Sequence, residues 1–294
     1  MTGQILRCEG LVKRYKDKEV IKNVNLTLEK GKIYGLIGRN GAGKTTLLSI
    51  MTSQNPATAG FVALDGQPVW ENEEALSHLC FSREISTNPT GGGIANLKVK
   101  EYLKIAEAYL PHWDSEMAER LVELFHIEKK KRISSLSKGM MSMVTIIVAM
   151  ASKADFTFLD EPVSGLDVVS REQFYRLLLD EFAESGRTFV ISTHIIEEAA
   201  ELFEEVIIIH EGEILIKENT QEFVESCAYV SGKAEDVDLA VQGLHTYKEE
   251  KLGRSKGVTV RLGAGERIQE NENITVQPLN LQKIFVAMCG GEGQ

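Results

Sequence analysis

A glycine-rich loop directly after a short apolar strand is the feature that most limits how this chain can fold. Residues 33–37 read IYGLI, a compact apolar run that favours a buried strand. The segment GRNGAGKTT follows at once, at residues 38–46, and fits the pattern G-x-x-x-x-G-K-[ST]. A helix is expected from Lys44. A strand, a glycine loop and a helix in this order predict a phosphate-binding P-loop in an α/β domain.

The chemistry of this loop follows from its backbone and its polar side chains. Glycines allow the backbone N–H groups to fold around phosphates, and the helix start adds positive potential. Lys44 is expected to reach the β- and γ-phosphates, and the Thr45 hydroxyl to ligate Mg²⁺. The alternative is a chance glycine turn, which the strand before it and the helix after it disfavour. The predicted nucleotide-binding residues are Gly38, Asn40, Gly41, Ala42, Gly43, Lys44, Thr45 and Thr46.

Two adjacent acids follow a second apolar strand, in the segment FTFLDEP at residues 156–162. Open α/β sheets bind ligands at the carboxyl ends of their strands. Successive side chains of a strand point to opposite faces, so Asp160 can serve a metal ion while Glu161 faces an attacking water. Asp160 is therefore predicted as a metal ligand and Glu161 as the general base. The alternative is a pair of acids that cap the next helix.

Two further side chains are weaker candidates when taken alone. His194 ends the strand RTFVISTH, where a neighbouring strand end would bring it near the γ-phosphate. A lone histidine is more often a structural or surface residue. Tyr15, in VKRYKDKEV, could stack on an adenine ring. Its local sequence by itself favours a tyrosine packed at a strand edge.

The order of elements predicts an α/β fold with a mostly parallel sheet, because apolar strands alternate with helices from residue 156 to 194. Strands at 5–11 and 25–28 predict an N-terminal antiparallel β part. Residues 97–131 read as strongly helical, and 206–216 as a hairpin. After about residue 220 short strand-like and helical pieces mix. We expect a nucleotide-binding domain at 1–220, with a helical subdomain at about 85–150, and a small α+β domain at 221–294.

Composition narrows the class of protein. The net charge of −10 argues against a nucleic-acid partner, which would require clustered Lys and Arg. No stretch approaches the roughly 18–20 apolar residues that span a bilayer, and the N-terminus has no secretory pattern. The cysteines are scattered and are expected to be free thiols in a reducing compartment. The chain is predicted to be cytosolic, with any membrane role acting through a partner.

These residues together are similar to an ATP-binding-cassette (ABC) ATPase over roughly residues 3–220. The P-loop falls at the family's Walker A motif and residues 156–161 at Walker B. Two more segments match family motifs: LSKGM at 136–140 the signature, and SGLD at 164–167 the D-loop. Tyr15 falls at the adenine-stacking aromatic and His194 at the switch histidine. Six motifs in the family's order make this resemblance far more specific than a P-loop alone.

The resemblance implies how the site is completed and what it works with. Two cassettes, identical or different, would pair head to tail, so that Ser137 and Gly139 contact the partner's ATP. ATP and Mg²⁺ are the implied ligands. A transmembrane permease would bind around residues 84–103. The chain would lie in the cytoplasm, as a peripheral protein on the inner face of the membrane. The segment from residue 108 to 140 is most similar to ATPases of bacterial exporters.

Two residues depart from the family pattern. Glu84, in CFSREIS, falls where the family usually has a glutamine that ligates Mg²⁺ and signals to the membrane subunit. A carboxylate is still a hard oxygen ligand, so Glu84 is predicted to join Thr45 and Asp160 at the metal. Met140 replaces another usual glutamine, in the signature, and removes a polar side chain beside the partner's nucleotide.

Two other functions fit parts of the sequence. Soluble ABC-type ATPases of translation or DNA repair carry two cassettes or a long coiled-coil insertion, and this chain has neither. A module that closes on ATP without hydrolysing it would not need Glu161 and His194. The sequence therefore favours a motor subunit of a membrane exporter.

Overall fold

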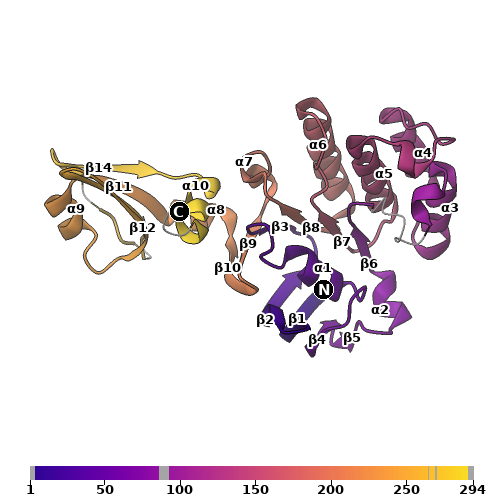
Figure 1. The fold of residues 1–294 in the computed structure, drawn as a ribbon, viewed down its shortest axis with the longest axis horizontal. Helices are drawn as coiled ribbons and strands as arrows, with labels where there is room; N and C mark the ends of the chain where they lie inside the picture. The colour runs from indigo at the N-terminus through magenta and orange to yellow at the C-terminus, as the bar shows by residue number, and fades with distance from the viewer. Residues whose placement is uncertain (1–3, 86–92, 264, 269, 291–294) are drawn as a thin grey trace.

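A six-stranded, mostly parallel sheet lies at the centre of the molecule (Figure 1), and its strands run in the order β10-β9-β3-β8-β7-β6. The computed structural model describes residues 4–85, 93–263, 265–268 and 270–290. Every neighbouring pair in this sheet is parallel except β9 and β10, which form the predicted hairpin. The strands are β3 Ile33–Ile37, β6 Leu79–Ser82, β7 Phe156–Asp160, β8 Thr188–Thr193, β9 Glu205–His210 and β10 Glu213–Asn219.

An antiparallel sheet, in the order β2-β1-β4-β5, lies below the central sheet in Figure 1, and helices α3 to α6 lie above it. This arrangement confirms the predicted P-loop α/β fold with an N-terminal antiparallel part. The strands are β1 Ile5–Tyr15, β2 Lys18–Glu29, β4 Ala59–Leu64 and β5 Gln67–Pro68. The helices of this large part are α1 Lys44–Met51, α2 Glu73–Ser77, α3 Val99–Tyr109, α4 Ser115–Leu124, α5 Lys138–Ala151, α6 Val168–Ser185, α7 Ile196–Ala199 and α8 Thr220–Glu225.

The central sheet has a hydrophobic core on each face, which explains the unbroken apolar run of β3. Tyr34 and Leu36 pack into the core shared with the antiparallel sheet and α1. Ile33 and Ile37 point the other way, into the core formed with the helical layer. All five residues of β3 are buried. The P-loop therefore starts from a rigid strand end in the middle of the sheet.

The structure corrects one sequence prediction, because residues 97–131 do not form one continuous helical stretch. Helix α3 ends at Tyr109 and α4 begins at Ser115. Pro111 has no N–H to donate, and the Asp114 side chain accepts a hydrogen bond from the Met117 N–H (2.9 Å) and so caps α4. The apolar spacing was read correctly, but the proline and the cap divide it.

The C-terminal part contains a separate four-stranded sheet in the order β12-β13-β11-β14, set to one side of β9 and β10 (Figure 1). A small apolar core lies between this sheet and α9. Helices α8 and α10 instead contribute to the larger core, where α10 packs on α7 and α8. The elements are β11 Cys227–Lys233, β12 His245–Leu252, β13 Ser255–Arg261, β14 Ile274–Pro278, α9 Ala234–Ala240 and α10 Leu281–Cys289.

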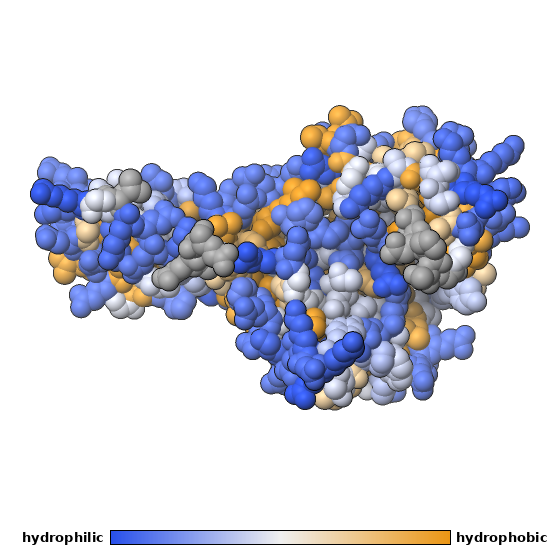
Figure 2. Space-filling view, viewed as in Figure 1, coloured by the Kyte–Doolittle hydropathy of each residue, from blue (hydrophilic) through white to orange (hydrophobic). Residues whose placement is uncertain are grey.

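The surface of the molecule is mostly hydrophilic in the view of Figure 2, with apolar residues gathered between the C-terminal part and the rest. None of the described helices combines the length and the apolar character needed to cross a membrane. The four cysteines are free, as predicted, and all of them are buried. The division at residue 220 remains a prediction.

Candidate functional site

The P-loop joins the end of β3 to the start of α1 with a backbone that only small residues tolerate. Gly41 and Gly43 have φ values of 81° and 110°, in the left-handed region. A side chain at Gly38 would place its Cβ 2.6 Å from the Ile209 carbonyl oxygen. Among the described residues no side chain caps α1. The first N–H groups of this helix are thus available to an anion.

The Lys44 side chain is almost fully buried and lies between the loop and Glu161, the residue after β7. Its Nζ donates to the Gly38 carbonyl oxygen (2.7 Å) and lies 3.8 Å from Glu161 Oε1. An ammonium group held at this point can approach the phosphates of a nucleotide that the loop surrounds.

A hollow of about 350 Å³ opens over this loop and is large enough for part of a nucleotide. Sequence reasoning identified the P-loop residues and Glu161 but did not identify Lys18, Val20 or Arg39. The residues that line the hollow are Lys18, Val20, Arg39, Asn40, Gly41, Gly43, Lys44, Thr45, Thr46 and Glu161. Lys18 and Val20 come from β2, which no local motif connects to the loop. The structure therefore brings most of the predicted loop residues together with Glu161.

Asp160 lies directly against the start of α1. Its Oδ2 accepts a hydrogen bond from the Thr45 hydroxyl (2.6 Å), and its Oδ1 accepts one from the Ser192 hydroxyl (2.5 Å). Ser192, on the neighbouring strand β8, was missed by sequence reasoning because only the parallel pairing of β7 with β8 places it here. A carboxylate and a hydroxyl side by side are oxygen donors of the kind that Mg²⁺ prefers.

The metal chemistry of this corner depends on the nucleotide as well. Within the described residues no group of three or more His, Cys, Asp or Glu side chains is placed to hold a metal ion by itself. Mg²⁺ commonly uses one or two protein ligands together with substrate phosphates and water, which fits the pair Thr45 and Asp160. Glu84 is exposed, and its Oε1 lies 3.5 Å from the Lys138 Nζ. That pairing ties Glu84 to the signature sequence.

Glu161 and His194 form a second pair beside the hollow. The His194 Nδ1 and the Glu161 Oε2 lie 2.6 Å apart, and a carboxylate acts as the acceptor. Glu161 has a φ of 50°, and its N–H donates to the Ser192 carbonyl oxygen (3.1 Å). These backbone constraints aim the carboxylate at Lys44 and His194. Neither acid caps the following helix, because Asp167 takes that role.

Tyr15 lies at the end of β1 and is 47% exposed. Its hydroxyl is hydrogen-bonded to the Asn55 amide, and the Lys13 Nζ lies 5.0 Å from the centre of its ring. Tyr15 does not line the hollow, but its pairing partner Lys18 does. Stacking of this ring on an adenine therefore stays a prediction.

The signature residues begin helix α5. The Ser137 hydroxyl accepts a hydrogen bond from the Met140 N–H (3.2 Å), so it caps this helix. Ser137 is exposed, whereas Met140 is partly buried against the large core. A Cβ on Gly139 would lie 2.6 Å from the Gly165 carbonyl oxygen. Neither Ser137 nor Gly139 lines the hollow over the P-loop.

The D-loop packs directly on this helix start. The Ser142 hydroxyl donates to the Ser164 carbonyl oxygen (2.7 Å), and Asp167 accepts a hydrogen bond from the Ser170 N–H (2.9 Å) at the start of α6. That backbone hydrogen bond lowers the pKa of Asp167. The contact couples the positions of the signature and the D-loop.

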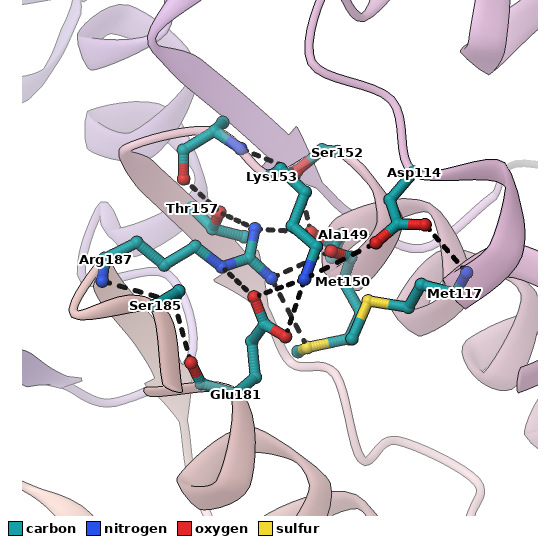
Figure 3. Close-up of polar contacts among 11 residues, drawn as sticks. Asp114, Met117, Ala149, Met150, Ser152, Lys153, Thr157, Glu181, Ser185 and Arg187 are labelled. Atoms are coloured by element: carbon teal, nitrogen blue, oxygen red, sulfur yellow. Dashed lines mark hydrogen bonds and ion pairs between the residues drawn. The ribbon is translucent and has the colours of Figure 1, made fainter. Parts of the chain in front are cut away.

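A buried ion cluster anchors the other end of α5 (Figure 3). Arg187, from the start of β8, donates to the carbonyl oxygens of Met150 (2.9 Å) and Ala149 (3.3 Å). Its Nε lies 3.1 Å from Glu181 Oε1, and the Lys153 Nζ lies 3.0 Å from both carboxylate oxygens. The last carbonyls of α5 are thus tied to α6 and the central sheet. This anchor helps to determine where the signature end of α5 points.

Known proteins resemble the chain both over this region and over its whole length. A match to the family described as ABC transporter extends over residues 21–164. The bacitracin transport ATP-binding protein BcrA of Enterococcus faecalis is 33% identical over 74% of this chain and 70% of its own length. The ABC transporter ATP-binding protein YtrB of Bacillus subtilis is 25% identical, over 98% of this chain and 99% of its own.

Solved structures agree with the fold. The dimeric structure of a post-hydrolysis state of an ATP-binding cassette, bound to ADP and phosphate, superposes with a TM-score of 0.63 at 23% identity. The match covers 73% of this chain and 98% of that one.

Proposed function

The chain belongs to the ABC transporter family as an ATP-binding subunit and ABC-type ATPase, and we propose that it is the motor of an exporter. In this role two cassettes close on ATP, hydrolyse it, and drive a separate permease from the cytoplasmic face of the membrane. The observation that supports this most is the hollow over the P-loop. It contains a phosphate-binding loop and an acid beside a histidine but lacks the signature residues. Exporter function is supported by the similarity to a bacitracin transport protein.

The proposed reaction is attack of water on the γ-phosphorus of ATP, with cleavage of its bond to the β–γ bridging oxygen, so that ADP and phosphate leave. Glu161 accepts the proton of the water, and His194 holds the carboxylate through its Nδ1. Lys44 and the N–H groups of the loop bind the phosphates. Thr45 and Asp160, with Glu84 as the predicted third ligand, would hold Mg²⁺, which neutralises the charge on the phosphates when it is bound.

The position of Ser137 supports the proposed pairing of two cassettes. This side chain is exposed at a helix start, lies outside its own chain's hollow, and can cap α5 while facing a partner. An anion is stabilised at such a helix N-terminus. We propose that Ser137 and Gly139 of each molecule close over the γ-phosphate that the other molecule binds.

The Ser137→Asp substitution tests this pairing without removing the cap, since aspartate caps helices as well as serine does. The new carboxylate would face the partner's γ-phosphate, and we expect ATP-dependent dimerisation to weaken roughly 100-fold or more. Sedimentation of the full chain with ATP measures it, in a Glu161→Gln background that prevents turnover. Ser137→Asn, with the same size and no charge, is the matched control. Equal dimerisation of the two variants would contradict the head-to-tail arrangement.

A groove of about 380 Å³ between the end of α1, β6, α3 and α5 is the proposed docking surface for the permease. Its rim carries two apolar side chains that project into solvent, Tyr109 (83% exposed) and Ile105 (44% exposed). Exposed aromatic residues beside a hollow are typical anchors of protein interfaces. The groove lies next to the 84–103 segment, of which residues 86–92 are outside the described part of the chain.

The Tyr109→Glu substitution tests this docking surface, because it places a charge at the most exposed apolar position of the groove. We expect the amount of permease that copurifies from membranes to fall roughly tenfold or more, with ATP binding unchanged. Leu239→Glu, at a 71% exposed leucine on α9, is the control for added charge. Undiminished recovery of a permease with Tyr109→Glu would exclude this groove. Absence of any membrane partner for the unaltered chain would remove the transport role itself.

A further inference from the structure

An ion pair joins the helix that follows the D-loop to the helix that follows His194. The Arg171 Nη1, in the first turn of α6, lies 3.0 Å from the Glu198 Oε1 of α7. The Arg171 side chain is only 17% exposed, and that of Glu198 is 38% exposed. The two residues come from segments on either side of β8, and no sequence motif identified them.

The stability of helix α7 depends on its tertiary contacts. It spans only Ile196–Ala199, and its N-cap Ile195 offers no side-chain hydrogen bond. A single helical turn is not stable by itself. Ile196 and Ala199 are buried, but the His194 side chain just before the helix is 55% exposed. The position of His194 therefore depends on what holds α7.

Tyr175 lies one turn further along α6 and places a polar group in a buried position. It is 9% exposed, and its hydroxyl is buried with no hydrogen-bond partner among the described residues. Burial raises the pKa of Tyr175 to about 12, and the carboxylates of Glu198 and Glu161 act in the same direction. The Arg171 Nε is likewise buried with no hydrogen-bond partner there. Such groups reduce stability, and a cluster of them beside an active site suggests a functional role.

We infer that Arg171 and Glu198 are positioning residues that hold α7, and through it His194, in register with Glu161. The carbonyl oxygen of Asp167, in the D-loop, accepts a hydrogen bond from the Arg171 N–H (3.0 Å), so Arg171 moves with the D-loop. Contact with a second cassette at the D-loop would thus reach the His194–Glu161 pair through this ion pair. The inference rests on the proposed roles of Glu161 and His194.

The test uses Arg171→Met, Glu198→Gln and the exchanged pair Arg171→Glu/Glu198→Arg in the full chain. We expect each single variant to lower kcat for ATP roughly 10- to 100-fold, since a misplacement near 1 Å costs about that much. The KM for ATP and the unfolding midpoint should stay close to those of the unaltered chain. The exchanged pair should recover part of kcat. Arg176→Met, which breaks an exposed pair on the same helix, is the matched control and should not change kcat.

Unchanged kcat in both single variants would overturn the inference, and so would losses that the exchanged pair does not reverse. Glu161→Gln, measured in the same assay, separates this failure from a failure of the proposed function. If Glu161→Gln is inactive while Arg171→Met is fully active, only the positioning role is wrong. If Glu161→Gln still turns over ATP, Glu161 is not the general base, and the proposed function on which the inference rests is wrong.

Discussion

Glu161→Gln is expected to reduce ATP turnover on the order of 10²- to 10⁴-fold while leaving ATP binding intact. The amide keeps the size of the side chain but cannot accept the proton of the attacking water. Lys44 loses the nearby Glu161 charge but keeps its hydrogen bond to the Gly38 carbonyl oxygen, so Lys44, Thr45 and the N–H groups of the P-loop still bind the phosphates. Phosphate release and the mass of the ATP-bound species measure the two effects separately. We expect the variant to accumulate as an ATP-bound dimer.

Two controls accompany this result. Glu172→Gln changes a carboxylate that is 75% exposed on α6 and should have no effect on turnover. Lys44→Ala should weaken nucleotide binding, whereas Glu161→Gln should slow only the hydrolysis step. Lys44→Ala should therefore not accumulate as an ATP-bound dimer. Turnover at the normal rate in Glu161→Gln would remove the proposed general base.

Glu181→Ala is expected to give the largest loss of stability, about 3–5 kcal/mol of unfolding free energy. Glu181 is fully buried, and its removal would leave the buried Arg187 guanidinium without its carboxylate partner. Burial already lowers the pKa of Arg187 against the opposing effect of Glu181, which indicates how strongly the charge depends on that partner. Because stabilities of whole domains are about 5–15 kcal/mol, this loss is a large share of the total.

Denaturant unfolding of the full chain measures the effect. Glu172→Ala, which breaks the exposed pair with Arg176 on the same helix, is the matched control and should cost less than about 1 kcal/mol. A similar small cost for Glu181→Ala would mean that Arg187 is held by its hydrogen bonds to the end of α5 alone. The role of the cluster in anchoring that helix would then be smaller than proposed.

The parts of the site that could be predicted from the sequence are those determined by consecutive residues. Gly41 and Gly43 adopt backbone conformations that glycine permits, so their spacing was enough to predict the loop. Asp160 ends β7, and Glu161 follows it with a φ of 50°, outside the strand. The two carboxylates have different partners, Thr45 for Asp160 and His194 for Glu161, but this left-handed residue rather than strand alternation separates them.

The residues that were missed depend on pairing between distant segments. Lys18 reaches the hollow because of the register of a hairpin, and Ser192 reaches Asp160 because β7 lies beside β8. Glu181 belongs to no motif, and only the packing of α6 makes it a buried anion. The break between α3 and α4 has a local signal, Pro111 with Asp114, but helical spacing of apolar residues continues on either side of it.

Folding during synthesis depends on α10, because this helix packs on α7 and α8. Leu281 and Ile284 fill part of the core formed by residues that leave the ribosome much earlier. Until the nine-residue helix α10 emerges, α7 and α8 lack the helix that packs on them. Apolar surface that stays uncovered during translation is prone to aggregation. A nascent chain of this protein therefore cannot close its hydrophobic interior one domain at a time, and a ribosome that stalls before residue 281 leaves it unfinished.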